Sequence, residues 1–157
     1  MKIGRARWAA GVFLFICLAS AMAAKCKCKV ADPKETTIWG GNQYVVLINE
    51  KPYRSIHGMV KLGADEEPTE KALVEIFTNP EHLLDESFRP ENGENQKRVR
   101  ACITGADGKF CFDHLPAGKY ELRVSISRGW DVTSEYVVVD PTQGQGGEIE
   151  VRLHIGT

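Results

Sequence analysis

The sequence predicts an all-β protein, an antiparallel β-sandwich of about seven short strands. Three observations support this class. Apolar and polar residues alternate with a period of two in several short runs, turn residues separate these runs, and few stretches show helical periodicity. The chain has 157 residues, which is enough for one ordinary domain with a core and a short extension.

The first 23 residues are typical of a secretory signal peptide. A basic start that contains Lys2, Arg5 and Arg7 precedes an apolar segment, and small residues follow at positions 21–23. We expect cleavage near Ala23 and a secreted or periplasmic protein. The apolar stretch is shorter than the roughly 20 residues of a spanning helix, so we expect no transmembrane segment in the mature chain. An uncleaved anchor helix is the alternative.

Residues 24–52 are expected to form an amino-terminal arm that leans against the domain and is partly ordered at most. The arm begins with a Cys-x-Cys pair, Cys26 and Cys28, and it contains an apolar run at residues 44–48 that could pair at a sheet edge. Two thiolates could bind a soft metal, but they supply only half of a tetrahedral site. The preferred interpretation is that these two cysteines form disulfides, which could tether the arm.

The domain proper is expected over residues 53–157, and its strands follow one another along the chain. The first two are expected at residues 55–62 and 72–78, where Asn79 and Pro80 end the second. A helical turn that starts at Pro80 and a long solvated loop follow up to residue 97. Later strands are expected at residues 98–104, 109–112, 119–127, 136–139 and 149–155. All of these ranges except the apolar run 136–139 alternate in polarity.

Residues 98–125 are expected to form the centre of the fold as three antiparallel strands with two tight turns. Residues 105–108, Gly-Ala-Asp-Gly, make the first turn, since Asp bonds its own backbone and Gly tolerates positive φ. In that register Cys102 lies directly opposite Cys111. The register therefore predicts a Cys102–Cys111 disulfide across a hairpin.

The other cysteines leave the connectivity open. Removal of the signal peptide would remove Cys17 and leave four of the five cysteines, an even number that is typical of an oxidising compartment. Four cysteines allow three connectivities. Beside the hairpin bond, Cys26 and Cys28 could bond to each other, or both could bond to Cys102 and Cys111 and so tie down the arm.

Several short motifs together resemble the carboxypeptidase regulatory-like domains. These motifs are Gly-Met-Val-Lys at 58–61, Ala-Leu-Val-Glu-Ile at 72–76, Thr-Gly-Ala-Asp-Gly-Lys-Phe-Cys-Phe at 104–112, Leu-Pro-Ala-Gly-Lys-Tyr-Glu-Leu at 115–122 and Gly-Trp at 129–130. The resemblance implies a transthyretin-like or immunoglobulin-like Greek-key sandwich. It also implies a secreted or envelope accessory module that is not an enzyme and needs no cofactor, and some relatives of this kind bind carbohydrate.

Two related groups with chemistry of their own give weaker resemblances. Adhesin domains that form a Lys–Asn isopeptide bond would use Lys61 and the acid Glu75, but residues 148–155 contain no Asn to receive the amine. Intradiol dioxygenases hold iron with two Tyr and two closely spaced His. The histidines here lie scattered at positions 57, 82, 114 and 154. We therefore expect neither an isopeptide bond nor an iron site, and an intradiol-like metalloenzyme is the least favoured alternative.

The charge balance excludes one class of partner and leaves the ligand open. A net charge of -1 gives no basic surface for a phosphate backbone, so we expect no nucleic acid partner. A non-catalytic module that binds an unknown protein or polysaccharide at the cell envelope is the favoured function, and a carbohydrate-binding module is the alternative. Loops at the sandwich ends carry the candidate binding residues His82, Asp85, Arg89, Trp130 and Tyr136.

Overall fold

The computed structural model describes residues 28–35, 43–63, 66–78, 80–84, 96–126 and 131–153, without the side chains of residues 43–45, 82 and 131. The first strands are β1 (Lys29–Val30), β2 (Gln43–Tyr53), β3 (Ile56–Leu62), β4 (Glu67–Pro68) and β5 (Ala72–Thr78). The 3₁₀ turn η1 (Pro80–Leu84) follows, then β6 (Arg98–Ile103), β7 (Lys109–Phe112), β8 (Gly118–Ile126), β9 (Asp131–Val139) and β10 (Ile149–Leu153). The predicted helical turn at Pro80 is confirmed.

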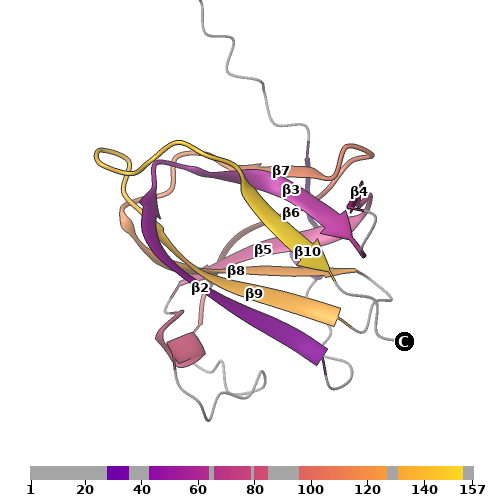
Figure 1. The fold of residues 1–157 in the computed structure, drawn as a ribbon, viewed down its shortest axis with the longest axis horizontal. Helices are drawn as coiled ribbons and strands as arrows, with labels where there is room; N and C mark the ends of the chain where they lie inside the picture. The colour runs from indigo at the N-terminus through magenta and orange to yellow at the C-terminus, as the bar shows by residue number, and fades with distance from the viewer. Residues whose placement is uncertain are drawn as a thin grey trace, which may run out of the picture.

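The strands form two sheets (Figure 1). One has six strands in the order β1-β6-β5-β8-β9-β2, and the other has the order β10-β3-β4 with β7 paired to β3. This arrangement confirms the all-β class, and both sheets contribute to one core, as in a β-sandwich. The described residues form ten strands, not seven. The sheets are also mixed rather than antiparallel, because β2 runs parallel to β9 and β10 parallel to β3.

The core lies between the inner faces of the sheets. Alternate residues of each strand point inward, which is the period-two pattern that the sequence predicts. In β10 these are Ile149, Val151 and Leu153, and all three are buried. They face large side chains from the other sheet, including Ile76 and Leu122. Burial of each such side chain contributes about 1.5–3 kcal/mol to stability.

A close backbone contact joins β3 to β10. Gly58 lies opposite Ile149 in the parallel pair, and a Cβ atom at this position would lie 1.9 Å from the Ile149 carbonyl oxygen. Only glycine allows the two strands to approach so closely. The Gly-Met-Val-Lys segment therefore has a packing role in holding the last strand.

The predicted hairpin between β6 and β7 is wrong. A turn does form at residues 105–108, where the Gly108 N–H donates to the Gly105 carbonyl over 3.0 Å. However, β6 pairs with β5 and β1, whereas β7 pairs with β3 in the other sheet. Buried Thr104 holds the crossing point, since its hydroxyl accepts from Ala72 N–H at 2.9 Å and donates to Thr69 O at 2.6 Å. The turn thus connects two sheets rather than two neighbouring strands.

The predicted Cys102–Cys111 disulfide is absent for the same reason. Cys102 lies in the core and is a free thiol, whereas Cys111 is disulfide-bonded. Cys111 belongs to the other sheet, where β7 pairs with β3 and Cys111 lies opposite His57. Cys111 lies between two inward-pointing residues, Phe110 and Phe112, so its own side chain points away from the core. The apolar residues Val99, Ala101 and Ile103 alternate with polar ones, which predicts that they form the buried face of β6, but Cys102 is buried and Val99 is 36% exposed.

The predicted arm contributes two strands to the six-stranded sheet. β2 is an edge strand eleven residues long, which confirms the edge pairing expected at residues 44–48. β1 forms the opposite edge against β6, and Ala31 beside it is buried. The sheet therefore extends well before residue 53. The predicted signal segment 1–23, its cleavage point at Ala23 and Cys26 lie outside the described residues.

Within the described residues, no helix is both long enough and apolar enough to cross a membrane.

Candidate functional site

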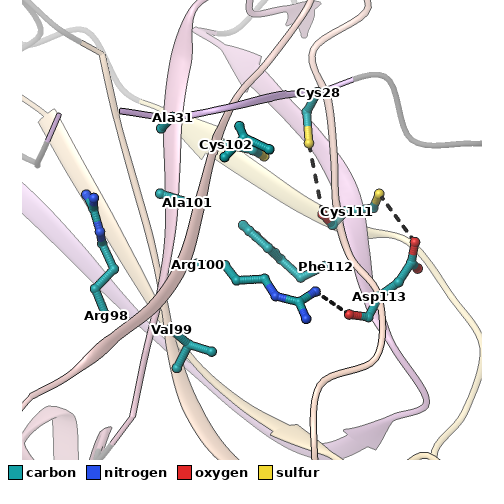
Figure 2. A pocket seen from close by; sticks show the side chains of 11 residues that line it. Cys28, Ala31, Arg98, Val99, Arg100, Ala101, Cys102, Cys111, Phe112 and Asp113 are labelled. Atoms are coloured by element: carbon teal, nitrogen blue, oxygen red, sulfur yellow. Dashed lines mark hydrogen bonds between the residues drawn. The ribbon is translucent and has the colours of Figure 1, made fainter. Parts of the chain in front are cut away.

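A groove of about 480 Å³ lies where the arm meets β6 and β7. Its lining comes from Cys28, Val30 and Ala31 of the arm, residues 98–102 of β6 and residues 111–113 at the end of β7. Figure 2 shows these side chains from close by. The groove is the principal candidate for a ligand site because it combines apolar and charged groups from three separate segments.

The groove has an apolar floor and a charged side. Buried Phe112 belongs to the floor, and Val30 and Val99 are exposed at its rim, Val30 to 82%. Arg100 is exposed and donates from one guanidinium nitrogen to the Asp113 carbonyl over 2.5 Å (Figure 2). A guanidinium has five N–H donors, so Arg100 keeps donors for a ligand.

Arg98, next along β6, clamps the arm. Its guanidinium donates to the Glu75 carboxylate at 2.9 Å and to the Pro33 carbonyl at 2.8 Å. It also donates to the carbonyls of Asp32, at 3.3 Å, and Glu35. Because Glu75 is fully buried, this charge-assisted contact joins the arm to the outer face of the six-stranded sheet.

Cysteine sulfurs gather at one end of the groove (Figure 2). The neighbouring Cys102 side chain lowers the pKa of the Cys28 thiol to about 6, although burial acts in the opposite direction. The same interaction, together with burial, raises the pKa of Cys102. Cys28 Sγ also lies 3.9 Å from the Cys111 carbonyl oxygen. Cys28 is therefore the more reactive thiol of the pair.

A second polar cluster covers the outer face of the six-stranded sheet. Buried Glu121 accepts two hydrogen bonds from Arg123, at 2.9 and 3.0 Å, and one from Ser134 at 2.8 Å. The Gln96 amide donates to Glu121 at 2.5 Å and accepts from Arg123 at 3.0 Å. The Arg123 guanidinium lies 4.2 Å from the Phe77 ring centroid. These groups satisfy one another, so the cluster anchors residue 96 to the sheet rather than offering a ligand site.

The structure describes few of the predicted binding residues. Asp85, Arg89 and Trp130 lie outside the described residues, as does the side chain of His82 within η1. Tyr136 is described, but it is only 3% exposed on β9. Its buried side chain cannot form an exposed aromatic platform by itself.

The residues considered for an isopeptide bond do not come together. Lys61 on β3 pairs with Glu150 at 2.7 Å and Glu66 at 3.3 Å, whereas Glu75 bonds to Arg98 in the other sheet. The part of the chain that the structure describes contains no group of three or more His, Cys, Asp or Glu side chains that could hold a metal ion.

The sequence analysis did not identify the arginines of the groove or the charged residues of the Glu121 cluster as functional candidates. Glu121 and Arg123 alternate along β8, so this pair was recognisable as one face of a strand. Arg98 and Arg100 have the same spacing in β6, but a register shift against β5 between them puts their side chains on opposite faces. Asp113 gave no such signal, because its place in the groove depends on how β7 crosses to the other sheet.

No family model matches the chain, and no curated protein matches it. The resemblance to the carboxypeptidase regulatory-like domains therefore rests on the short motifs alone.

Proposed function

We propose that this protein is a secreted, non-catalytic binding module that recognises a partner polypeptide at the cell envelope through the groove between the arm, β6 and β7. The observation that carries this proposal is the groove itself, which places an exposed guanidinium beside an apolar floor. We further infer a Greek-key sandwich of the carboxypeptidase regulatory-like type. The motifs at residues 104–112 and 115–122 support that inference.

The groove fits a ligand with an apolar group next to a carboxylate. The exposed valines at positions 30 and 99 and the Phe112 ring offer apolar contact, and Arg100 offers N–H donors for a carboxylate. An extended peptide segment carries both groups on alternate residues. The two-sheet scaffold keeps these groups at fixed positions, which lowers the entropy lost on binding.

The test is an NMR titration of ¹⁵N-labelled protein with two peptides. Acetyl-Leu-Asp-Leu-Asp-amide matches the groove, and acetyl-Leu-Lys-Leu-Lys-amide has the opposite charge. We expect the acidic peptide to shift the amides of Val99, Arg100 and Asp113, and the basic peptide to leave them unchanged. Arg100→Ala should weaken binding about tenfold, as expected for the loss of a charged hydrogen bond. Arg54→Ala, which removes an exposed arginine outside the groove lining, is the matched control.

Two results would overturn parts of the proposal. Equal shifts with both peptides, or an Arg100→Ala variant that binds as well as the control, would remove the carboxylate site. Retention on a polysaccharide resin that is lost in Trp130→Ala would replace the polypeptide ligand with carbohydrate. Secretion is tested separately, since the exported protein should begin near residue 24.

A further inference from the structure

The arm is positioned against β6 by contacts that do not involve sulfur. Lys29 and Val30 pair with Ile103 and Cys102, and the Ala31 N–H donates to the Ala101 carbonyl over 3.2 Å. Arg98 then holds the carbonyls of residues 32, 33 and 35. The backbone that carries Cys28 is therefore already fixed next to β6.

The Cys28 and Cys102 side chains meet at this junction. Cys102 lies opposite Val30, two residues after Cys28 on the same face of β1, and Cys28 packs against the core cluster to which Cys102 belongs. A disulfide requires neighbouring backbones with side chains directed at each other, and this arrangement needs no change in strand pairing. Figure 2 shows both side chains at the same end of the groove.

We propose that Cys28 and Cys102 form a disulfide that fastens the amino-terminal arm to β6 and closes one end of the groove. The reaction partner is an external disulfide, such as oxidised glutathione or a disulfide-carrying oxidoreductase. If the signal peptide is removed, Cys26 is the remaining cysteine that can bond to Cys111. The two bonds would then join the arm to both sheets.

The Cys28–Cys102 bond would form by thiol–disulfide exchange in two steps. The Cys28 thiolate attacks one sulfur of the external disulfide, which forms a mixed disulfide and releases the other sulfur as a thiolate. Cys102 then loses its proton and attacks the Cys28 sulfur, which releases the second external thiol. The protein loses two electrons and two protons, and the external disulfide is reduced to two thiols. Cys28 is suited to the first step because it is partly exposed and more acidic than buried Cys102.

The bond has a consequence for ligand binding. Cys28, Val30 and Ala31 form one wall of the groove, and the bond would fix that wall to β6. Reduction would leave the wall held by the short β1 pairing and the Arg98 contacts. The affinity of the groove would therefore be highest in the oxidised protein.

The experiment is tryptic peptide mapping without reduction, on protein equilibrated with a mixture of reduced and oxidised glutathione. Trypsin separates Cys102, on peptide 101–109, from Cys111, on peptide 110–119. The peptides that carry Cys26 and Cys28 have the same composition, Cys-Lys, so a Lys27→Arg variant is used to give them different masses. We expect the Cys28 dipeptide on 101–109 and the Cys26 dipeptide on 110–119. A Cys28 dipeptide on 110–119, or a free thiol at Cys102 after oxidation, would overturn the proposal.

Thermal melting supplies a second readout. Under oxidising conditions Cys28→Ala and Cys102→Ala should each lower Tm by the same amount, on the order of 10 °C, because each removes one crosslink that spans a long loop. The double variant should lose no more than either single variant. Losses that add in the double variant would show that the two residues act separately and would overturn the bond.

Discussion

Two buried glutamates on neighbouring strands have opposite environments. Glu121 of β8 is fully buried on the outer face of the six-stranded sheet, where Arg123, Ser134 and Gln96 all bond to its carboxylate. Glu135 of β9 points to the inner face and is 5% exposed. None of the ion pairs found among the described residues includes Glu135. Its partner is the neutral amide of Asn49, and burial raises the pKa of Glu135 to about 7.

The comparison shows how one sheet accommodates buried carboxyls in two ways. A guanidinium with bidentate geometry compensates the charge of the Glu121 carboxylate inside the protein. Without a cation, the Glu135 carboxyl resists ionisation, and it loses its proton only as the pH rises towards and above about 7. The first arrangement makes stability depend on one partner residue, and the second makes it depend on pH.

The largest expected effect is that of Arg123→Met. This substitution leaves the Glu121 carboxylate buried without its cation, which is expected to lower the free energy of unfolding by about 3–5 kcal/mol. Urea denaturation at pH 7 measures the loss. The double variant Glu121→Gln/Arg123→Met removes both charges and should regain more than half of the loss. A single variant that loses less than about 1 kcal/mol would show that the pair does not hold the outer face together.

The second effect concerns Glu135 and its pH dependence. The carboxyl has a pKa of about 7 in the folded protein against 4.5 as its ordinary value, so between these pH values only the folded state holds the proton. The free energy of unfolding should therefore fall as the pH rises from 4.5 to above 7, by a total of about 3 kcal/mol. Below pH 4.5 the carboxyl is protonated in both states and this contribution is constant.

The measurement is the unfolding free energy of the wild type and of Glu135→Gln from pH 4.5 to pH 8. The variant should match the wild type at the acid end and exceed it at pH 8, because the amide cannot ionise. Glu148→Gln, a substitution of an exposed glutamate, is the control for a general change in charge. A constant difference between Glu135→Gln and the wild type across this range would contradict the assignment.

The smallest effect is expected for Gln96→Ala. The amide of Gln96 joins the end of the long connection between β5 and β6 to Glu121 and Arg123. Its loss should cost about 1–2 kcal/mol and should speed amide exchange at Thr78, whose N–H donates to the Lys97 carbonyl over 3.0 Å. Gln143→Ala, at an exposed loop position, should change neither quantity. An unchanged rate of amide exchange at Thr78 would show that Gln96 does not anchor this segment.

The strands were predictable because their signals are local. β5 has the bounds expected from its apolar run and the Asn-Pro stop, and the buried residues of β10 follow its alternation. β6 shows the limit of such reasoning. Its alternation offers two faces, and the buried one carries Cys102 rather than Val99, because Cys102 lies opposite the core residue Val74 of β5.

The candidate site could not be predicted in the same way. Its lining residues come from positions 28–31, 98–102 and 111–113, and no local pattern relates these segments. The turn at residues 105–108 has the same sequence signature whether it joins paired strands or opposite sheets. The predicted disulfide failed because the sequence showed the turn but not its direction.

The sequence by itself determined the all-β class and the positions of several strands, such as β5 and β10, since these depend on the period of side chains along a single segment and on the backbone preferences of Gly, Pro and Asn. Only the tertiary structure decided which strands are neighbours, which of two strand faces is buried and which thiol meets Cys28. These properties depend on contacts between residues as far apart as positions 28 and 102. Such contacts form only when both sheets pack around a common core.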